Sequence, residues 1–84
     1  MEKLLVDVEL PVLGIRYELL AKPDVTGHQL LAAILKLAGE REDILVKEDN
    51  REFLLADREK ECLLDPARTL KEQGVTSGDR LLIL

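Results

Sequence analysis

Cys62 and His28 are the residues of this chain with the most versatile chemistry, and each type occurs once. A catalytic thiol needs a base or a positive charge nearby to lower its pKa. Cys62 instead lies between Glu61 and Leu63, and nothing in the sequence brings His28 towards it. One His and one Cys also cannot supply the ligands of a zinc site, which has three or four from protein. We therefore expect no catalytic residue and no metal site.

Acidic residues gather in three short runs that could imitate a calcium-binding loop. The runs occupy 40–43, 48–52 and 57–61. None has the acidic spacing and the central glycine of an EF-hand loop. We interpret them as solvated loops of mixed charge, and we expect no cofactor.

Composition narrows the class of function further. The 84 residues suffice for one domain, 1–84, with one core. Tyr17 and Phe53 are the only aromatic residues and the net charge is −5, so neither base stacking nor attraction to phosphates is expected. No apolar run approaches the roughly 18 residues of a membrane span. Asp7 and Glu9 interrupt any signal-peptide core. We expect a soluble, cytoplasmic protein that binds no nucleic acid and does not insert into a membrane.

The first half of the chain predicts a β-hairpin and a helix. Apolar and polar residues alternate over 3–10 and over 15–21, with Gly14 in the connecting loop. Thr26 and Gln29 have the spacing of a capping box, which predicts that a helix begins there. Gly39 is a candidate for its C-terminal cap. The segment 40–52 is predicted to be a short helical turn or a loop.

The second half predicts short strands joined by turns. Strands are expected at 53–56 and 62–64 around a polar turn at 57–61, and a last strand at 80–84. Thr69 or Asp65 would cap a helical turn at 70–73. The element order predicts an α+β fold, a mixed sheet of four to five strands packed on one main helix. The last strand would pair in parallel with the first, because the chain between them is long enough for the crossover.

The closing segment LDPARTLKEQGVTSGDRLLIL, at 64–84, resembles the end of ubiquitin-like (β-grasp) domains. Within that superfamily the chain most resembles the YukD/EsaB-type proteins of type VII secretion loci in Gram-positive bacteria. The similarity covers the hairpin at 4–20, the turn at 57–61 and the run 74–84. It implies a non-conjugating ubiquitin-like interaction module, not an enzyme, that is an accessory or regulatory component of a type VII secretion system. Its implied partners are secretion-system membrane subunits or the FtsK/SpoIIIE-type ATPase.

Two other functions remain open at this point. A ubiquitin-like regulatory or adaptor subunit unrelated to secretion would have the same sequence features. A sulfur carrier or conjugated modifier is disfavoured, because both need a terminal Gly-Gly and the sequence contains no Gly-Gly. The residues after Leu81 are instead apolar and typical of a strand.

Strand alternation also predicts an apolar patch on the face of the sheet away from the helix. Leu54 joins this patch if Phe53 and Leu55 are the inward pair. Exposed contiguous aliphatic surface is typical of a binding site. We expect the patch to bind a protein partner, and the same leucines could equally support a homodimer. Its members are Leu5, Leu20, Leu54, Leu82 and Leu84.

Overall fold

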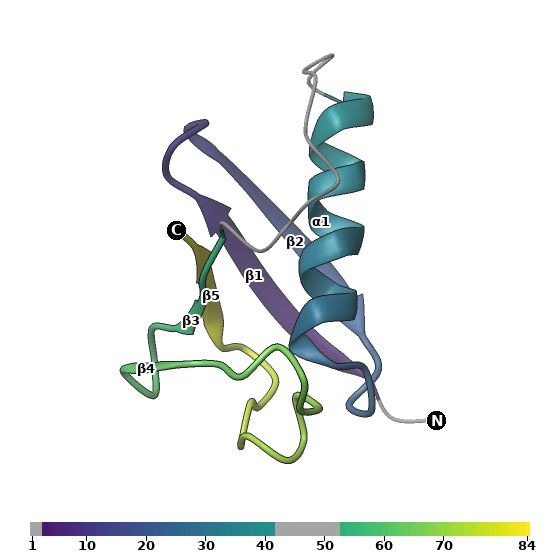
Figure 1. Ribbon diagram of the computed structural model, residues 1–84, viewed down its shortest axis with the longest axis vertical. Helices are drawn as coiled ribbons and strands as arrows, with labels where there is room; N and C mark the ends of the chain where they lie inside the picture. Colours follow the sequence, from purple (N-terminus) through teal and green to yellow (C-terminus); the bar gives the residue numbers. More distant parts are fainter. Residues whose placement is uncertain (1–2, 42–52) are drawn as a thin grey trace.

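One long helix crosses one face of a five-stranded mixed sheet in the described part of the chain (Figure 1). The computed structural model describes residues 3–41 and 53–84. Most of the predicted connector at 40–52 therefore lies outside the described residues. The elements are β1 (Leu4–Leu10), β2 (Ile15–Ala21), α1 (Gly27–Arg41), β3 (Leu55–Asp57), β4 (Cys62–Leu63) and β5 (Arg80–Ile83).

The sheet has the strand order β2-β1-β5-β3-β4. Strands β1 and β2 form the predicted antiparallel hairpin, and Gly14 takes a φ of 65° in its loop, a conformation that glycine adopts without steric cost. Strand β5 lies between β1 and β3, parallel to β1 and antiparallel to β3. The predicted parallel pairing of the first and last strands is confirmed.

Helix α1 begins at the predicted capping box. The Thr26 N–H donates to Gln29 Oε1 at 2.9 Å, and the Gln29 N–H donates to Thr26 Oγ1 at 3.1 Å. The helix continues through Gly39 to Arg41, so the prediction that Gly39 caps it is wrong. The residues after Gly39 are good helix formers, and the Arg41 guanidinium lies 5.9 Å from the centre of the Tyr17 ring.

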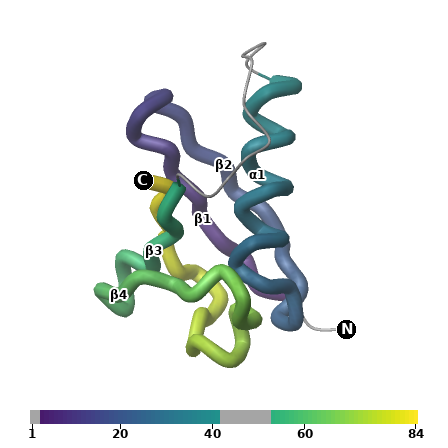
Figure 2. The backbone as a smooth tube through the Cα atoms, viewed as in Figure 1, coloured from purple at the N-terminus to yellow at the C-terminus, as the bar shows by residue number. Residues whose placement is uncertain are grey.

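The core lies between α1 and the sheet. It combines inward residues of β1 and β5, such as Val8 and Leu81, with Ile34 of the helix. Leu70 and Val75 also belong to it, and Leu70 is completely buried. Both come from the chain between β4 and β5, which loops beneath the start of α1 (Figure 2). Backbone bonds hold this loop there, including one from the Leu70 N–H to the Val25 carbonyl at 2.9 Å.

The same loop has its own capping box, at Thr69 and Glu72. The Thr69 N–H donates to Glu72 Oε1 at 3.0 Å, and the Glu72 N–H donates to Thr69 Oγ1 at 3.1 Å. The backbone bond from Thr69, and then the bond from its hydroxyl, lower the pKa of Glu72. Of the two predicted caps for this turn, Thr69 occupies the capping position.

Gly27 is the point at which α1 and the loop approach most closely, and it yields a stability prediction. A Cβ at this position would lie 3.2 Å from the Asp65 carbonyl oxygen and 3.2 Å from Pro66 Cα. Both are backbone atoms, which cannot rotate away. Gly27→Ala should therefore lower the free energy of unfolding by about 1–3 kcal/mol in urea denaturation. Helix propensity alone would raise it, so an unchanged or higher urea midpoint would show that the loop moves aside.

Candidate functional site

The face of the sheet that points away from α1 carries all five residues of the predicted patch. On β1, the outward residues Leu5, Asp7 and Glu9 alternate with the buried Val6 and Val8. The same alternation leaves Leu82 between buried residues on β5. Phe53 is half-buried against the core and Leu55 is buried, which leaves Leu54 outward as the sequence argument required.

Cross-strand register brings one group of these residues together. Leu82 lies opposite Ala56, and Ala56 lies opposite Leu63 on the edge strand β4. Leu54 and Leu84 exchange two backbone hydrogen bonds, at 2.9 and 2.8 Å, so they are also direct neighbours. We call Leu54, Leu63, Leu82 and Leu84 the C-terminal patch. Leu82, at its centre, is half-buried, and the exposed fractions are 53% for Leu54, 64% for Leu63 and 49% for Leu84.

Leu5 and Leu20 form a separate pair. They lie opposite each other on β1 and β2 and are 40% and 61% exposed. Asp7 lies between this pair and the C-terminal patch, with Glu18 beside it on β2 and Arg80 beside it on β5. The five predicted patch residues therefore fall into two apolar groups on either side of a charged row.

The charged row continues from Arg80 to Arg58, which directly follows β3 and whose N–H donates to the Arg80 carbonyl at 2.8 Å, so it is acidic at one end and basic at the other. Arg16 Nε lies 3.4 Å from Asp7 Oδ1, and Arg80 Nε lies 3.8 Å from Glu59 Oε1. Exposed pairs of this kind contribute little to stability, but charges beside an apolar patch select its partner. Asp7, Glu9 and Glu18 thus make the border acidic on β1 and β2, whereas Arg80 and Arg58 make it basic on β5 and at the end of β3.

Two further apolar features were missed at the sequence level. Leu63 was expected in a strand but was not assigned to a face, and only its pairing with Ala56 places it in the patch. Val12 and Leu13, in the hairpin loop, are 84% and 37% exposed. Because β5 runs parallel to β1, the hairpin loop and the C-terminal residue Leu84 lie at the same end of the sheet (Figure 1).

Cys62 and His28 lie on different elements, and Cys62 lies opposite Asp57 in the pairing of β4 with β3. Cys62 is exposed on β4. His28 is exposed in the first turn of α1, where its backbone N–H donates to the Pro66 carbonyl at 2.9 Å. Within 3–41 and 53–84, no group of three or more His, Cys, Asp or Glu side chains is arranged to hold a metal ion. No helix in those residues has the length and apolar character of a membrane span.

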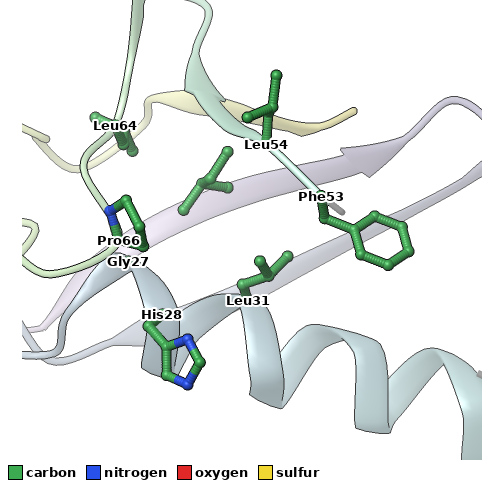
Figure 3. Close-up of a pocket in the computed structure, with 8 residues that line it drawn as sticks. Gly27, His28, Leu31, Phe53, Leu54, Leu64 and Pro66 are labelled. Atoms are coloured by element: carbon green, nitrogen blue, oxygen red, sulfur yellow. The ribbon is translucent and has the colours of Figure 1, made fainter. Parts of the chain in front are cut away.

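A pocket of about 260 Å³ lies on the other side of Leu54 (Figure 3). Leu31 and His28 of α1 form one wall, Phe53 and Leu54 another, and Leu64 and Pro66 a third. The lining is mostly aliphatic, and the residues carry no group suited to acid, base or nucleophilic chemistry beyond the exposed His28. Figure 3 shows the Leu54 side chain pointing away from α1, towards the open face.

Comparison with known proteins identifies the fold. No protein-family model matches the sequence, and no curated protein matches it. Among solved structures, the ubiquitin-like domain of an Arabidopsis thaliana protein matches with a TM-score of 0.76 and 18% identity, over 100% of this chain and 78% of that chain. The EccD5 ubiquitin-like domain from Mycobacterium xenopi matches with a TM-score of 0.75 and 18% identity, over 100% of this chain and 94% of that chain.

A third match comes from a larger assembly. A chain of the MycP5-free ESX-5 inner membrane complex matches with a TM-score of 0.75 and 21% identity, over 100% of this chain but 21% of that chain. Identities this low show a shared fold and nothing finer. The predicted architecture is confirmed: the chain has the ubiquitin-like β-grasp fold, with a five-stranded mixed sheet packed on one helix in the described ranges 3–41 and 53–84.

Proposed function

We propose that this chain is a protein-interaction module that binds its partner through the C-terminal patch. The observation that carries this proposal is the grouping of Leu54, Leu63 and Leu84 around Leu82 on an open sheet face. Exposed leucines scattered singly need no explanation, whereas neighbouring ones indicate a surface that a partner covers. The module acts by binding and performs no catalysis of its own.

The border of the patch indicates the chemistry of the partner. Asp7, Glu9 and Glu18 border it on β1 and β2, and Arg80 and Arg58 border it on β5 and at the end of β3. Aliphatic or aromatic anchors on the partner would fill the patch, and Lys or Arg beside those anchors would meet the carboxylates. We therefore expect a partner surface that is apolar at its centre, basic where it faces Glu9 and Asp7, and acidic where it faces Arg58 and Arg80.

We further propose that the module is an accessory or regulatory component of a type VII secretion system, with a cytoplasmic location. The YukD/EsaB-like sequence features support this, together with the structural likeness to the EccD5 domain and to a chain of the ESX-5 inner membrane complex. Secretion-system membrane subunits or the FtsK/SpoIIIE-type ATPase would then be the partners. The equally strong likeness to a plant ubiquitin-like domain is as compatible with the alternative of an adaptor unrelated to secretion.

The patch is tested by binding to the soluble ATPase domains of a type VII system from the source organism. Leu54→Ser and Leu63→Ser should each weaken binding about tenfold in isothermal titration calorimetry, which corresponds to about 1.4 kcal/mol. Their exposed side chains leave the fold intact when replaced. In a ¹⁵N NMR titration, the amides of Leu54, Leu63 and Leu82 should shift most.

Leu20→Ser is the matched control, because Leu20 is as exposed as Leu63 but lies across the charged row. Its affinity should stay within about twofold of the unmodified chain, since a residue outside the contact is energetically neutral. Equal losses for Leu20 and Leu63 would show that both apolar groups form one interface. If no patch variant weakens binding, the C-terminal patch is not the binding surface. If the chain binds no secretion subunit, the alternative of an adaptor unrelated to secretion is favoured. If light scattering shows that the molar mass doubles as the concentration rises, a second copy of the chain covers the C-terminal patch.

A further inference from the structure

Asp57 and Asp79 are two buried carboxyl groups on neighbouring segments. Asp57 ends β3 and is 1% exposed, and Asp79 immediately precedes β5 and is 5% exposed. Strands β3 and β5 pair side by side, with Asp57 opposite Leu81. Aspartate is rarely buried unless it is paired, and two carboxylates in contact cannot both be ionised without a large cost.

Asp57 organises the turn that joins β3 to β4. Its Oδ1 accepts the backbone N–H groups of Glu59 at 2.9 Å and Lys60 at 3.1 Å. Its Oδ2 is buried, and no ordinary donor of the described residues reaches it. Burial, and then the hydrogen bond to Asp79, raise the pKa of Asp57 to about 6, against the opposing effect of the two backbone N–H groups.

Asp79 is the ionised member of the pair. Its Oδ2 accepts Lys60 Nζ at 3.1 Å and the Thr76 N–H at 3.1 Å, and its Oδ1 accepts the Thr76 hydroxyl at 3.1 Å. Burial opposes ionisation of Asp79, but the bonds from Asp57, Thr76 and Lys60 outweigh it and lower its pKa. The bond to Asp79 in turn raises the pKa of Lys60.

The other charges around this pair do not neutralise a second carboxylate. Arg58 follows Asp57 but is exposed, and Glu59 in the same turn pairs with Arg80 of β5 at 3.8 Å. The exposed Cys62 lies opposite Asp57 on β4. Lys60 is the cation bound directly to the pair, and its side chain is 39% exposed. Glu61, at the end of the turn, has a φ of 54°, a strained value for a residue other than glycine. The turn is therefore held closed against local strain.

We propose that Asp57 and Asp79 share one proton and form a pH-sensitive clamp, which fastens the β3–β4 turn to the turn before β5 and loosens when the proton is lost. With the proton, Asp57 donates to Asp79 while Asp79 holds Lys60 and Thr76. Without it, two buried negative charges face one ammonium, and Asp57 Oδ2 has no donor. The β3–β4 turn, with its strained Glu61, is the part that opens.

The clamp also bears on the C-terminal patch, because Leu63 follows the β3–β4 turn on β4. If that patch binds the partner, affinity should fall as pH rises through the titration of Asp57. This consequence rests on the proposed function. The clamp itself is independent of it and is tested on the isolated chain.

The direction of the pH effect follows from linkage. The folded-state pKa of Asp57, about 6, lies above its ordinary value of 3.8, so the folded state holds the proton more tightly than the unfolded state. The stability that this proton provides is complete below pH 3.8 and is lost as the pH rises to about 6. The pKa of Asp79 is lowered, so its effect on stability has the opposite sign. The stability that ionised Asp79 provides is lost as the pH falls below the ordinary pKa of aspartate.

Asp57→Asn is the decisive variant. Asn Oδ1 can still accept the N–H groups of Glu59 and Lys60, and its Nδ2 donates to Asp79 at every pH. Between pH 4.5 and 7.5, the folding equilibrium constant of the unmodified chain should fall on the order of tenfold to a hundredfold more than that of Asp57→Asn. Urea denaturation at each pH measures this difference. Asp65→Asn is the control, because Asp65 is an exposed turn carboxylate, bonded to the Ala67 N–H at 2.9 Å, and its profile should follow the unmodified chain.

Carboxyl-carbon NMR of the unmodified chain tests the same proposal without any variant. The Asp57 carboxyl signal should titrate near pH 6, and amide exchange at Glu59 and Lys60 should accelerate beyond the intrinsic pH effect above that point. A midpoint near 4 for Asp57, or parallel pH profiles for Asp57→Asn and the unmodified chain, would overturn the clamp. If Asp57 titrates near pH 6 but partner binding does not change with pH, the clamp is supported and its effect on the C-terminal patch is rejected.

Discussion

Replacing Leu70 by alanine is expected to lower the free energy of unfolding by about 2–5 kcal/mol. Leu70 is 0% exposed and belongs to the hydrophobic core, although it lies in the loop between β4 and β5. Removing its isobutyl group leaves a cavity beneath the start of α1, where the backbone bond to Val25 fixes the loop and limits its collapse. A domain of 84 residues is stable by roughly 4–13 kcal/mol, so this one change could leave much of the population unfolded at 37 °C.

Leu63→Ala is the matched control for Leu70→Ala. It removes the same atoms from a side chain that is 64% exposed, and it should change the free energy of unfolding by no more than about 0.5 kcal/mol. Both values come from urea denaturation at one pH. Similar effects for the two leucines would mean that the loop carrying Leu70 is not part of the cooperative core.

Asp79→Ala should have the second-largest effect, a loss of about 2–4 kcal/mol in the free energy of unfolding. The Asp79 carboxylate accepts the Thr76 N–H, the Thr76 hydroxyl and the Lys60 ammonium, and under the proposed clamp it also accepts a hydrogen bond from protonated Asp57. Alanine leaves the part-buried N–H and hydroxyl of Thr76 without this acceptor and removes the group to which a protonated Asp57 would donate, whereas Lys60 can turn towards water. The turn at 76–79 then loses its bonds to the β3–β4 turn.

Glu18→Ala is the control for Asp79→Ala, because it removes an exposed carboxylate from β2. Its effect on stability should lie within about 0.5 kcal/mol. Thermal denaturation followed by circular dichroism measures both variants at about pH 5, where Asp57 still holds its proton. A loss below about 1 kcal/mol for Asp79→Ala would show that water replaces the contacts of its carboxylate with Thr76 and Lys60, and it would count against the clamp.

These two predictions concern the same stretch of chain, the loop and turn between β4 and β5. Leu70 anchors this stretch to the core, and Asp79 anchors it to the β3–β4 turn. The stretch therefore connects the helix side of the sheet to the edge that carries Leu63. Partner binding at the C-terminal patch would depend on both anchors, because they fix where β4 and β5 present their leucines.

The sequence by itself determined the parts of this protein that depend on near neighbours. Alternation with a period of two predicted the hairpin, and the spacing of Thr26 and Gln29 predicted the start of α1, because each signal is complete within a few residues. The element order then predicted the parallel pairing of β1 and β5, since a long crossover permits few topologies. Local pattern failed at the end of α1, where the residues following Gly39 continue the helix.

Tertiary structure alone decided how residues from distant segments meet. Alternation identified the outward leucines, but only cross-strand register showed that Asp7 separates Leu5 and Leu20 from the C-terminal patch and that Leu63 belongs to it. The sequence also did not predict the burial of Asp57 and Asp79, because each stands in a turn-like sequence and becomes buried only when β3 and β5 pair. Strand register is set by the summed packing of the whole core, so the residues that share a face or a proton can be identified only once that packing is known.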